Sequence, residues 1–126
     1  MKLSKQISGQ KFCIYYIVFD DGSCPAGDFL EQLKQNNVAS HRSLVILLKR
    51  HAEYGQIMNE RKSKCIEGRR NLFEFKSSQG DRLTYFYLKG WRTVLIHGFH
   101  KGAPAGTEYD RAERIRDQYL REVEDV

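Results

Sequence analysis

Three strand-like segments follow one another closely in the second half of the sequence, and they constrain the possible folds more than any other feature. They cover residues 71–77, 82–88 and 92–99 and are rich in aromatic and β-branched residues. Short turn sequences separate them, Gln-Gly-Asp at residues 79–81 and Lys-Gly at residues 89–90. Because Lys-Gly suits a two-residue hairpin loop, although less well than Asn-Gly, the pattern predicts consecutive antiparallel strands.

Alternation along these strands predicts which side chains share a face of the sheet. In the second strand, one face should carry Arg82, Thr84, Phe86 and Leu88. In the third strand, one face should carry Trp91, Thr93, Leu95, His97 and Phe99, and the other Arg92, Val94, Ile96 and Gly98.

One strand and two helices are predicted before these strands. Residues 11–19 are apolar on both faces, which is typical of an interior strand. A helix is predicted over residues 25–35, because Pro25 suits a first helical position. A second helix is predicted over residues 40–54, where Gly55 supplies a stop. Since a short loop joins the two helices, they should form an antiparallel hairpin.

A last helix is predicted to begin at Thr107, whose hydroxyl suits an N-cap, with Asp110 as a weaker capping-box partner. Its apolar stripe consists of Tyr109, Ala112, Ile115 and Tyr119. The acidic end, residues 122–126, is expected to fray. The order strand, helix, helix, three strands, helix predicts one α+β domain over residues 1–126. The first strand should insert beside a later strand, under the two-helix hairpin.

Composition narrows the class of protein further. The chain has 126 residues and 40% hydrophobic residues, which is ordinary for a globular domain. No apolar run is long enough to cross a bilayer, and the polar N-terminus lacks the apolar core of a signal peptide, so we expect a cytoplasmic protein. The three cysteines are widely spaced, which predicts reduced thiols and neither a disulfide framework nor a zinc site.

Positive charge is concentrated in one part of the chain. The net charge is +5, and residues 61–101 alone contain ten Lys or Arg against three acidic residues. Basic residues gathered in one region suggest a polyanionic partner such as nucleic acid. The alternative is a solvated sheet face, because Lys and Arg are common on strands that face water.

Signatures of common enzyme classes are absent from the sequence. It has no phosphate-binding glycine loop, no set of His, Cys or acidic residues at metal-ligand spacing, and no nucleophile elbow. We therefore predict no metal and no cofactor. Cationic and imidazole side chains with interleaved tyrosines remain as candidates. They are Lys62, Lys64, Arg69, Arg70, Lys76, Arg82, Arg92, His97, His100 and Lys101, with Tyr85 and Tyr87.

This set of residue types suits metal-independent cleavage of RNA, in which the 2′-hydroxyl attacks the adjacent phosphate. Histidine, or a lysine crowded by cations, could transfer the protons. Arginine matches phosphate oxygens, and tyrosine can stack on bases. His97 shares its predicted face with Leu95 and Phe99, so a buried structural role is an equal alternative. His100 and Lys101 follow a strand end, where functional residues often lie.

The order of short motifs resembles that of the RelE/HigB toxin superfamily, closest to its phage-derived HigB-like branch. The matching segments are Asn-Leu-Phe-Glu-Phe-Lys (71–76), Asp-Arg-Leu-Thr-Tyr-Phe-Tyr (81–87), Val-Leu-Ile-His-Gly-Phe-His-Lys (94–101) and Glu-Tyr-x-x-Ala (108–112). Upstream, Cys-Pro-Ala-Gly-Asp-Phe-Leu-Glu-Gln-Leu (24–33) is similar to the family's "PVxxFLxxL". The resemblance covers the chain from about residue 11 to residue 119.

The resemblance implies a microbial-RNase-like α+β fold and ribosome-dependent cleavage of messenger RNA. It also implies an antitoxin partner, which in the HigB branch is often a helix-turn-helix, HigA-like protein. Arg82 matches the arginine of the family's "YRV" and would contact phosphate. His97 matches the histidine of "LHGF", and Lys101 matches the first lysine of "FxKK". Tyr109 matches an apolar position that packs the last helix.

The chain departs from the family pattern at several positions. Lys76 replaces an arginine and so loses bidentate geometry, Asp81 replaces a tyrosine, and Gly102 replaces the second lysine of "KK". The loop over residues 102–106 is also shorter. Two alternatives therefore stand beside the ribonuclease. One is a gyrase-poisoning toxin of the related ParE branch, and the other is an RNA- or ribosome-binding protein with weakened or lost catalysis.

Overall fold

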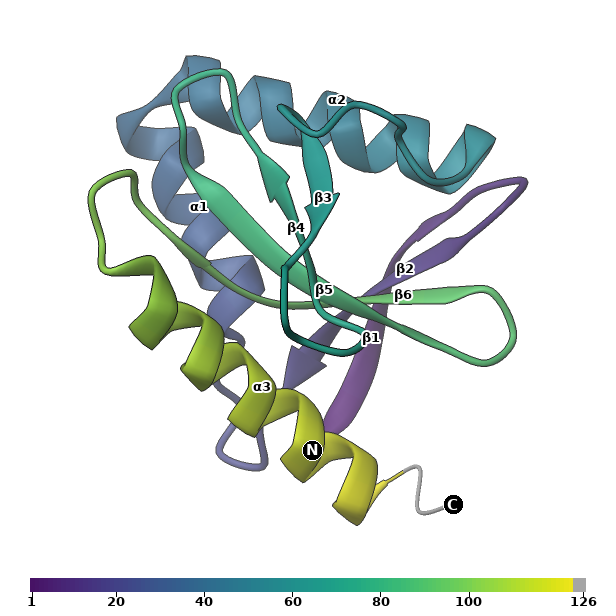
Figure 1. The fold of residues 1–126 in the computed structure, drawn as a ribbon. Coiled ribbons are helices and arrows are strands. Elements are labelled where there is room, and N and C mark those ends of the chain that lie inside the picture. The colour runs from purple at the N-terminus through teal and green to yellow at the C-terminus, as the bar shows by residue number, and fades with distance from the viewer. Residues whose placement is uncertain (124–126) are drawn as a thin grey trace.

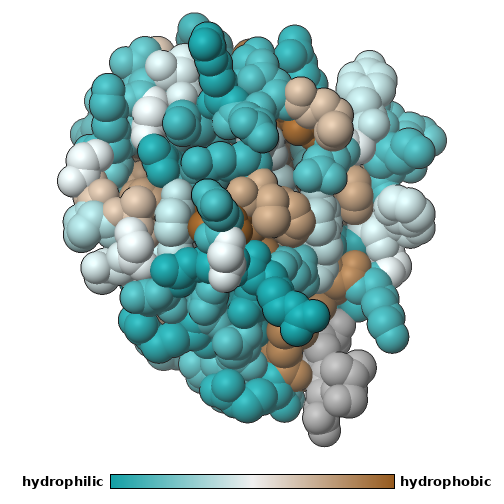
Figure 2. Space-filling view, viewed as in Figure 1, coloured by the Kyte–Doolittle hydropathy of each residue, from teal (hydrophilic) through white to brown (hydrophobic). Residues whose placement is uncertain are grey.

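In the computed structural model, which describes residues 1–123, the chain forms a six-stranded sheet with α1 and α2 on one face and α3 on the other (Figure 1). The elements are β1 (Lys2–Ser8), β2 (Cys13–Val18), α1 (Pro25–Asn36), α2 (Val38–Tyr54), β3 (Ser63–Cys65), β4 (Phe73–Lys76), β5 (Arg82–Leu88), β6 (Arg92–Phe99) and α3 (Ala105–Glu122). Hydrophilic side chains cover most of the face in Figure 2. The predicted α+β class is confirmed. Most of the segment expected to fray, residues 124–126, lies outside the described residues.

The strands lie in the order β1-β2-β6-β5-β4-β3. β2 pairs with β6 in parallel, with Cys13 opposite Arg92 and Tyr16 opposite Leu95, and the other pairs are antiparallel. The predicted insertion of the first strand beside a later strand is therefore confirmed, as are the hairpins that join β4, β5 and β6.

Two strands were not predicted from the sequence. β1 pairs with the outer edge of β2, with Lys2 opposite Val18 and Ser8 opposite Cys13. β3 pairs with β4 at the other edge of the sheet, with Ser63 opposite Phe75. Both strands are half-exposed edge strands, so their sequences lack the continuous apolar run that marks an interior strand.

Two of the three helices, α2 and α3, begin at slightly different residues from those predicted. α1 begins at Pro25, as expected. α2 begins two residues before Ser40, because the Asn37 side chain accepts a hydrogen bond from the Ser40 N–H at 3.2 Å and acts as the N-cap. α3 begins at Ala105, so the prediction that Thr107 is its N-cap is wrong. Thr107 lies inside the first turn, where Pro104 precedes the helix.

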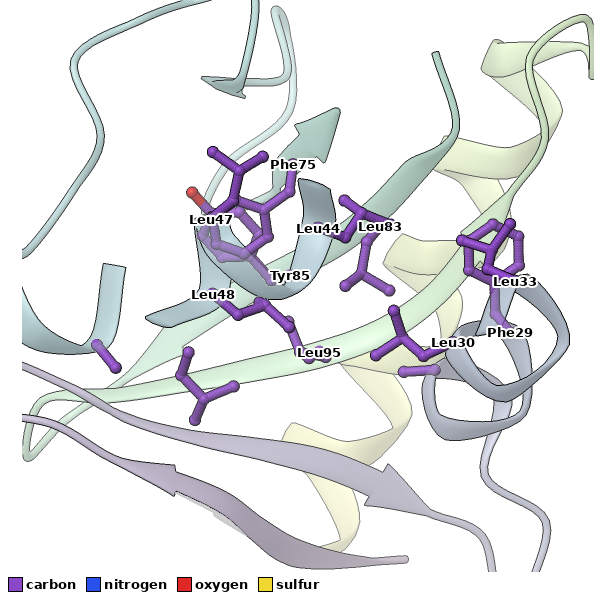
Figure 3. Close-up of a cluster of buried hydrophobic side chains, with 13 residues drawn as sticks. Phe29, Leu30, Leu33, Leu44, Leu47, Leu48, Phe75, Leu83, Tyr85 and Leu95 are labelled. Atoms are coloured by element: carbon purple, nitrogen blue, oxygen red, sulfur yellow. The ribbon is translucent and has the colours of Figure 1, made fainter. Parts of the chain in front are cut away.

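Between the sheet and the helix pair lies a hydrophobic cluster, shown in Figure 3. Leu44 of α2, Leu83 of β5 and Leu95 of β6 are fully buried there. The rings of Phe75 and Tyr85 stack with their centroids 4.2 Å apart. Burial of each such leucine stabilises the fold by about 1.5–3 kcal/mol.

A second cluster lies between the sheet and α3. The predicted stripe on this helix is confirmed, because Ala112, Ile115 and Tyr119 are buried and Tyr109 packs beside them. Phe86 and Leu88 of β5 belong to the same cluster, as the predicted alternation of this strand requires.

A bulge in β6 breaks the predicted alternation of that strand. Tyr85 lies opposite Leu95, but Leu83 lies opposite Gly98, so β6 holds one extra residue between these pairs. Leu95 therefore faces the helix pair, whereas His97 lies 3.8 Å from Glu108 of α3. The prediction that His97 and Phe99 share a face with Leu95 is wrong, because the bulge reverses the alternation after it.

The β5–β6 hairpin also differs from the prediction. Leu88 pairs with Arg92, so the loop contains three residues and not two. Gly90 has φ +83° and Trp91 has φ +59°. This left-handed conformation costs a residue with a side chain about 1–2 kcal/mol, and the Trp91 side chain is 67% exposed.

Candidate functional site

A cavity of about 820 Å³ opens at the end of the sheet where β4 turns into β5. Its walls come from α2, the residues before β3, the β4–β5 turn and the segment after β6. Six lining side chains are cationic, and none of the described lining residues is Asp or Glu. The cations are Arg50, Arg61, Lys62, Lys76, Arg82 and Lys101.

Two of these cations are direct neighbours across the sheet. Lys76 is the last residue of β4 and pairs with Arg82, the first residue of β5. Like charges placed directly opposite each other on neighbouring strands destabilise a sheet. Glu74 lies near Arg82 from outside the cavity, so the excess positive charge rests mainly on Lys76 and the four other lining cations, and an anionic ligand would relieve it.

Buried partners hold Arg82 in position. Its Nη1 donates to the Tyr109 hydroxyl at 2.9 Å and lies 3.5 Å from Oε2 of Glu74. The Tyr109 hydroxyl donates to Oε1 of Glu74 at 2.6 Å, and the Glu74 side chain is 1% exposed. Burial and this hydrogen bond raise the pKa of Tyr109 to about 12, so the phenol keeps its proton at neutral pH. Arg82 is thus oriented before any ligand binds.

Glycine in the β4–β5 turn makes room for Lys101. Gly80 has φ +87°, and a Cβ at this position would lie 2.9 Å from Cδ of Lys101. The aliphatic part of Lys101 therefore crosses the turn where a larger residue would block it. This packing brings Lys101, from the segment after β6, to the cavity beside Lys76 and Arg82.

A buried carboxylate anchors the same turn to the helix pair. Ser40 of α2 donates to Oδ2 of Asp81 at 2.5 Å, and Ser40 Oγ lies 2.6 Å from Ser77 Oγ. His100 Nδ1 lies 3.1 Å from Oδ1 of Asp81, and its Nε2 lies 3.3 Å from Oε1 of Gln32 on α1. His100 is therefore bound behind the turn and does not line the cavity, although Lys101 beside it does.

His97, the other candidate histidine, is 1% exposed. Its Nδ1 bonds to the Thr84 hydroxyl at 2.8 Å. Burial, with a smaller effect of Arg111, lowers its pKa to about 4, so the Glu108 carboxylate nearby does not keep it charged. A catalytic role for His97 does not fit this position, because a substrate cannot reach the ring.

Among the predicted RNA-binding residues, only Lys62 lines the cavity. Lys64 lies 3.9 Å from Glu74, and Arg69 pairs with Asp110 at 2.7 Å. Arg70 is exposed on the turn before β4, and the Arg92 Nε donates to the Lys89 carbonyl at the opposite end of the sheet. Lys64 and Arg69 thus both lie beside the Glu74–Tyr109 pair that contacts Arg82, whereas Arg92 lies apart from them.

Neither tyrosine is placed to stack on a base. Tyr85 is fully buried, and its hydroxyl bonds to Ser63 at 2.8 Å. Tyr87 is half-buried, with its ring 5.2 Å from that of Phe12 and 4.9 Å from that of Phe73. The prediction that these rings contact RNA is wrong for Tyr85, because β5 turns it into the core under α2.

Sequence reasoning missed two cations of the cavity. Arg50 lies on α2, and Arg61 precedes β3. Arg50 follows Ser43, Ile46 and Leu47 on one helical face, and all four line the cavity. The spacing of these four residues indicates a shared helical face, but the sequence does not show that this face lies against the β4–β5 turn.

Comparisons with known proteins assign no function to this cavity, so its geometry alone defines the candidate site. No protein-family model matches the chain, and no curated protein matches its sequence. Within residues 1–123, no three His, Cys, Asp or Glu side chains are grouped to hold a metal ion. No helix in the described part of the chain has the length and apolar character needed to cross a membrane. Fold and site together define an α+β protein with a cationic cavity.

Proposed function

We propose that the cationic cavity binds the phosphate backbone of RNA. The observation that carries the proposal is the gathering of six cations, without an acidic side chain among the described lining residues, around about 820 Å³. Phosphate contacts of this kind supply most of the affinity of proteins for nucleic acids. Ile46 and Leu47 give the wall on α2 an apolar surface, on which a base could pack.

We further propose that the cavity cleaves the RNA. The 2′-oxygen would attack the adjacent phosphorus, its proton would pass to a base, and the bond from phosphorus to the 5′-oxygen would break as that oxygen gains a proton. Arg82 is oriented to stabilise the negative charge that develops on the phosphoryl oxygens, with Lys76 beside it. Because both candidate histidines lie outside the cavity, Lys101 is our candidate for proton transfer.

The proposed biological role is that of a cytoplasmic toxin of the RelE/HigB type, which cleaves messenger RNA on the ribosome and is inhibited by a helix-turn-helix antitoxin. Three of the motifs that resemble this family each contribute one cation to the cavity. Lys76, Arg82 and Lys101 come from different motifs, yet all three line the same cavity. The α+β architecture is compatible with the RelE-like fold that we propose.

A second candidate function is binding to RNA or the ribosome without cleavage. The observation that favours it is the position of His97 and His100, both of which lie outside the cavity. In that case the cations would hold RNA, but no imidazole would be available to transfer protons.

The proposal is tested by induced expression of the chain, followed by mapping of messenger RNA 5′ ends. We expect cuts in phase with codons, and Arg82→Ala should reduce them at least about 100-fold. The matched control is Arg114→Ala, which removes an exposed arginine of α3. Growth arrest that persists with soluble, folded Arg82→Ala protein would contradict the role of Arg82. Ribosome association without cuts would support the binding-only function, and broken DNA with intact RNA would support a ParE-like toxin.

A further inference from the structure

The tip of the β5–β6 hairpin presents the sole tryptophan of the chain to solvent. Trp91 is 67% exposed and has a left-handed backbone conformation. β5 runs from Arg82 at the cavity to Leu88 beside this tip, so about 20 Å of strand separates the two places. Figure 1 shows the hairpin at the end of the sheet opposite the β4–β5 turn. An unfavourable backbone conformation that holds a large ring in solvent suggests a binding role.

Contacts beneath Trp91 hold it in place. The Cys13 N–H donates to the Trp91 carbonyl at 3.0 Å, which ties the hairpin to β2. The Trp91 ring lies 5.7 Å from that of Phe12, and Phe12 stacks on His51 at 4.7 Å and on Tyr87 at 5.2 Å. A line of aromatic rings thus supports the exposed indole from the core, and little conformational freedom would be lost when a ligand binds to it.

The surroundings of Trp91 are basic. Lys89 and Arg92 flank it in the hairpin, and Lys11 precedes its partner Phe12. The hairpin, residues 88–92, and the turn that carries Phe12, residues 9–12, contain no Asp or Glu. Glu53 at the end of α2 is an acidic residue near the β1–β2 turn, where Lys49 and Arg50 accompany it. Lysine is depleted at the core of protein–protein interfaces, so Lys89 beside Trp91 and Lys11 beside Phe12 favour a polyanionic partner over a protein.

We propose that Trp91 stacks on an unpaired base of RNA while Lys89 and Lys11 contact the adjacent phosphates. Aromatic rings beside cations are the usual means of holding single-stranded RNA, since every base has a face on which a ring can stack. This second contact rests on the proposed binding of RNA, and it would let the chain hold an RNA at both ends of the sheet.

The test is fluorescence, because all tryptophan emission from this chain comes from Trp91. Short single-stranded RNA of mixed sequence should quench that emission on titration, and Arg82→Ala protein should still show the quenching. Binding of the same RNA, labelled and followed by anisotropy, should weaken about 5- to 100-fold in Trp91→Asn. Asn tolerates the left-handed conformation, so this variant should fold. Trp91→Phe keeps a ring and should retain most of the affinity.

Different outcomes separate this inference from the proposed function. RNA that binds with unchanged Trp91 emission and equal affinity for Trp91→Asn would overturn the stacking site, leave the cavity as the RNA site and point to a protein contact for Trp91. Lack of any RNA binding by the unmodified chain would overturn both proposals. An equal loss of affinity in Trp91→Asn and Trp91→Phe would also overturn stacking, because a ring would then be insufficient.

Discussion

The face of the sheet under α1 and α2 carries the larger hydrophobic cluster, although it also buries His51 and Asp81, whereas the face under α3 buries the carboxylate that contacts Arg82. Leu44, Leu83 and Leu95 typify the first face. On the second, the Glu74 carboxylate and the His97 ring are 1% exposed. Hydrophobic packing stabilises without fixing direction, but hydrogen bonds and ion pairs orient their partners. The first face thus supplies more of the hydrophobic stabilisation, and the second orients Arg82.

The largest expected effect on stability comes from a substitution in the hydrophobic cluster under α1 and α2. Leu44→Ala should lower the free energy of unfolding by about 2–5 kcal/mol, because it leaves a cavity among fully buried neighbours. Urea unfolding measures this change. The control on the same helix is Val38→Ala, which removes an exposed side chain and should change stability by less than about 0.5 kcal/mol. Similar losses in both variants would show that α2 does not pack as described.

Acid should lower the stability of the fold, because each face of the sheet holds one buried histidine that is hydrogen-bonded to a threonine. Burial lowers the pKa of His51 and of His97 to about 4, below the ordinary 6.5. Between these values the unfolded chain binds more protons, so the stability that is present above pH 6.5 is lost as the pH falls toward 4. Each histidine should account for up to about 3 kcal/mol.

Urea unfolding at several pH values measures this dependence. His51→Gln and His97→Gln should each flatten the slope of stability against pH in that range. A slope that both variants leave unchanged would show that neither ring is held neutral by burial.

A third substitution tests the position of Gly98, which the bulge in β6 turns toward α1. A Cβ on Gly98 would lie 2.1 Å from the ring of Phe29 on α1, so Gly98→Ala should destabilise the protein by about 1–3 kcal/mol. Gly106→Ala in α3, where a Cβ meets open space, is the matched control and should not destabilise. Thermal unfolding measures both. Equal melting temperatures would place Gly98 away from Phe29 and contradict its position on the face under α1.

The smallest expected effect tests whether the face under α3 holds Arg82 in position. Tyr109→Phe removes the hydroxyl between Arg82 and Glu74, and should lower kcat for RNA cleavage about tenfold with a smaller change in KM. Tyr54→Phe, at a 79% exposed position, is the control. If both variants cleave equally well, Arg82 does not depend on Tyr109 for its position.

Much of the framework was predictable, because it follows from local patterns. Helix α1 begins at Pro25, the interior strand β2 is apolar on both faces, and β5 alternates as expected. The β6 bulge was not predictable, because nothing in residues 92–99 marks an extra residue until the strand is paired with β5. The error over His97 follows from that bulge alone.

The candidate site was predicted only in part. Lys62, Lys76, Arg82 and Lys101 were named from the sequence, and the fold brings all four to one cavity. The rest of the predicted set does not line this cavity, since Tyr85 lies in the core and Arg69 pairs with α3. Charge and residue type identified candidates but could not tell a cation that faces a cavity from one that faces an acidic neighbour.

By itself, the sequence determined the α+β class, the hairpin-linked strands and the concentration of positive charge, because periodicity, turn residues and composition are properties of short segments. Tertiary structure alone decided which cations meet, which histidines are buried and which ring is left in solvent. These outcomes depend on contacts between residues far apart in the chain, such as Arg82 with Tyr109 and Gly80 with Lys101. Such contacts are set by strand register and helix packing, which no single segment encodes.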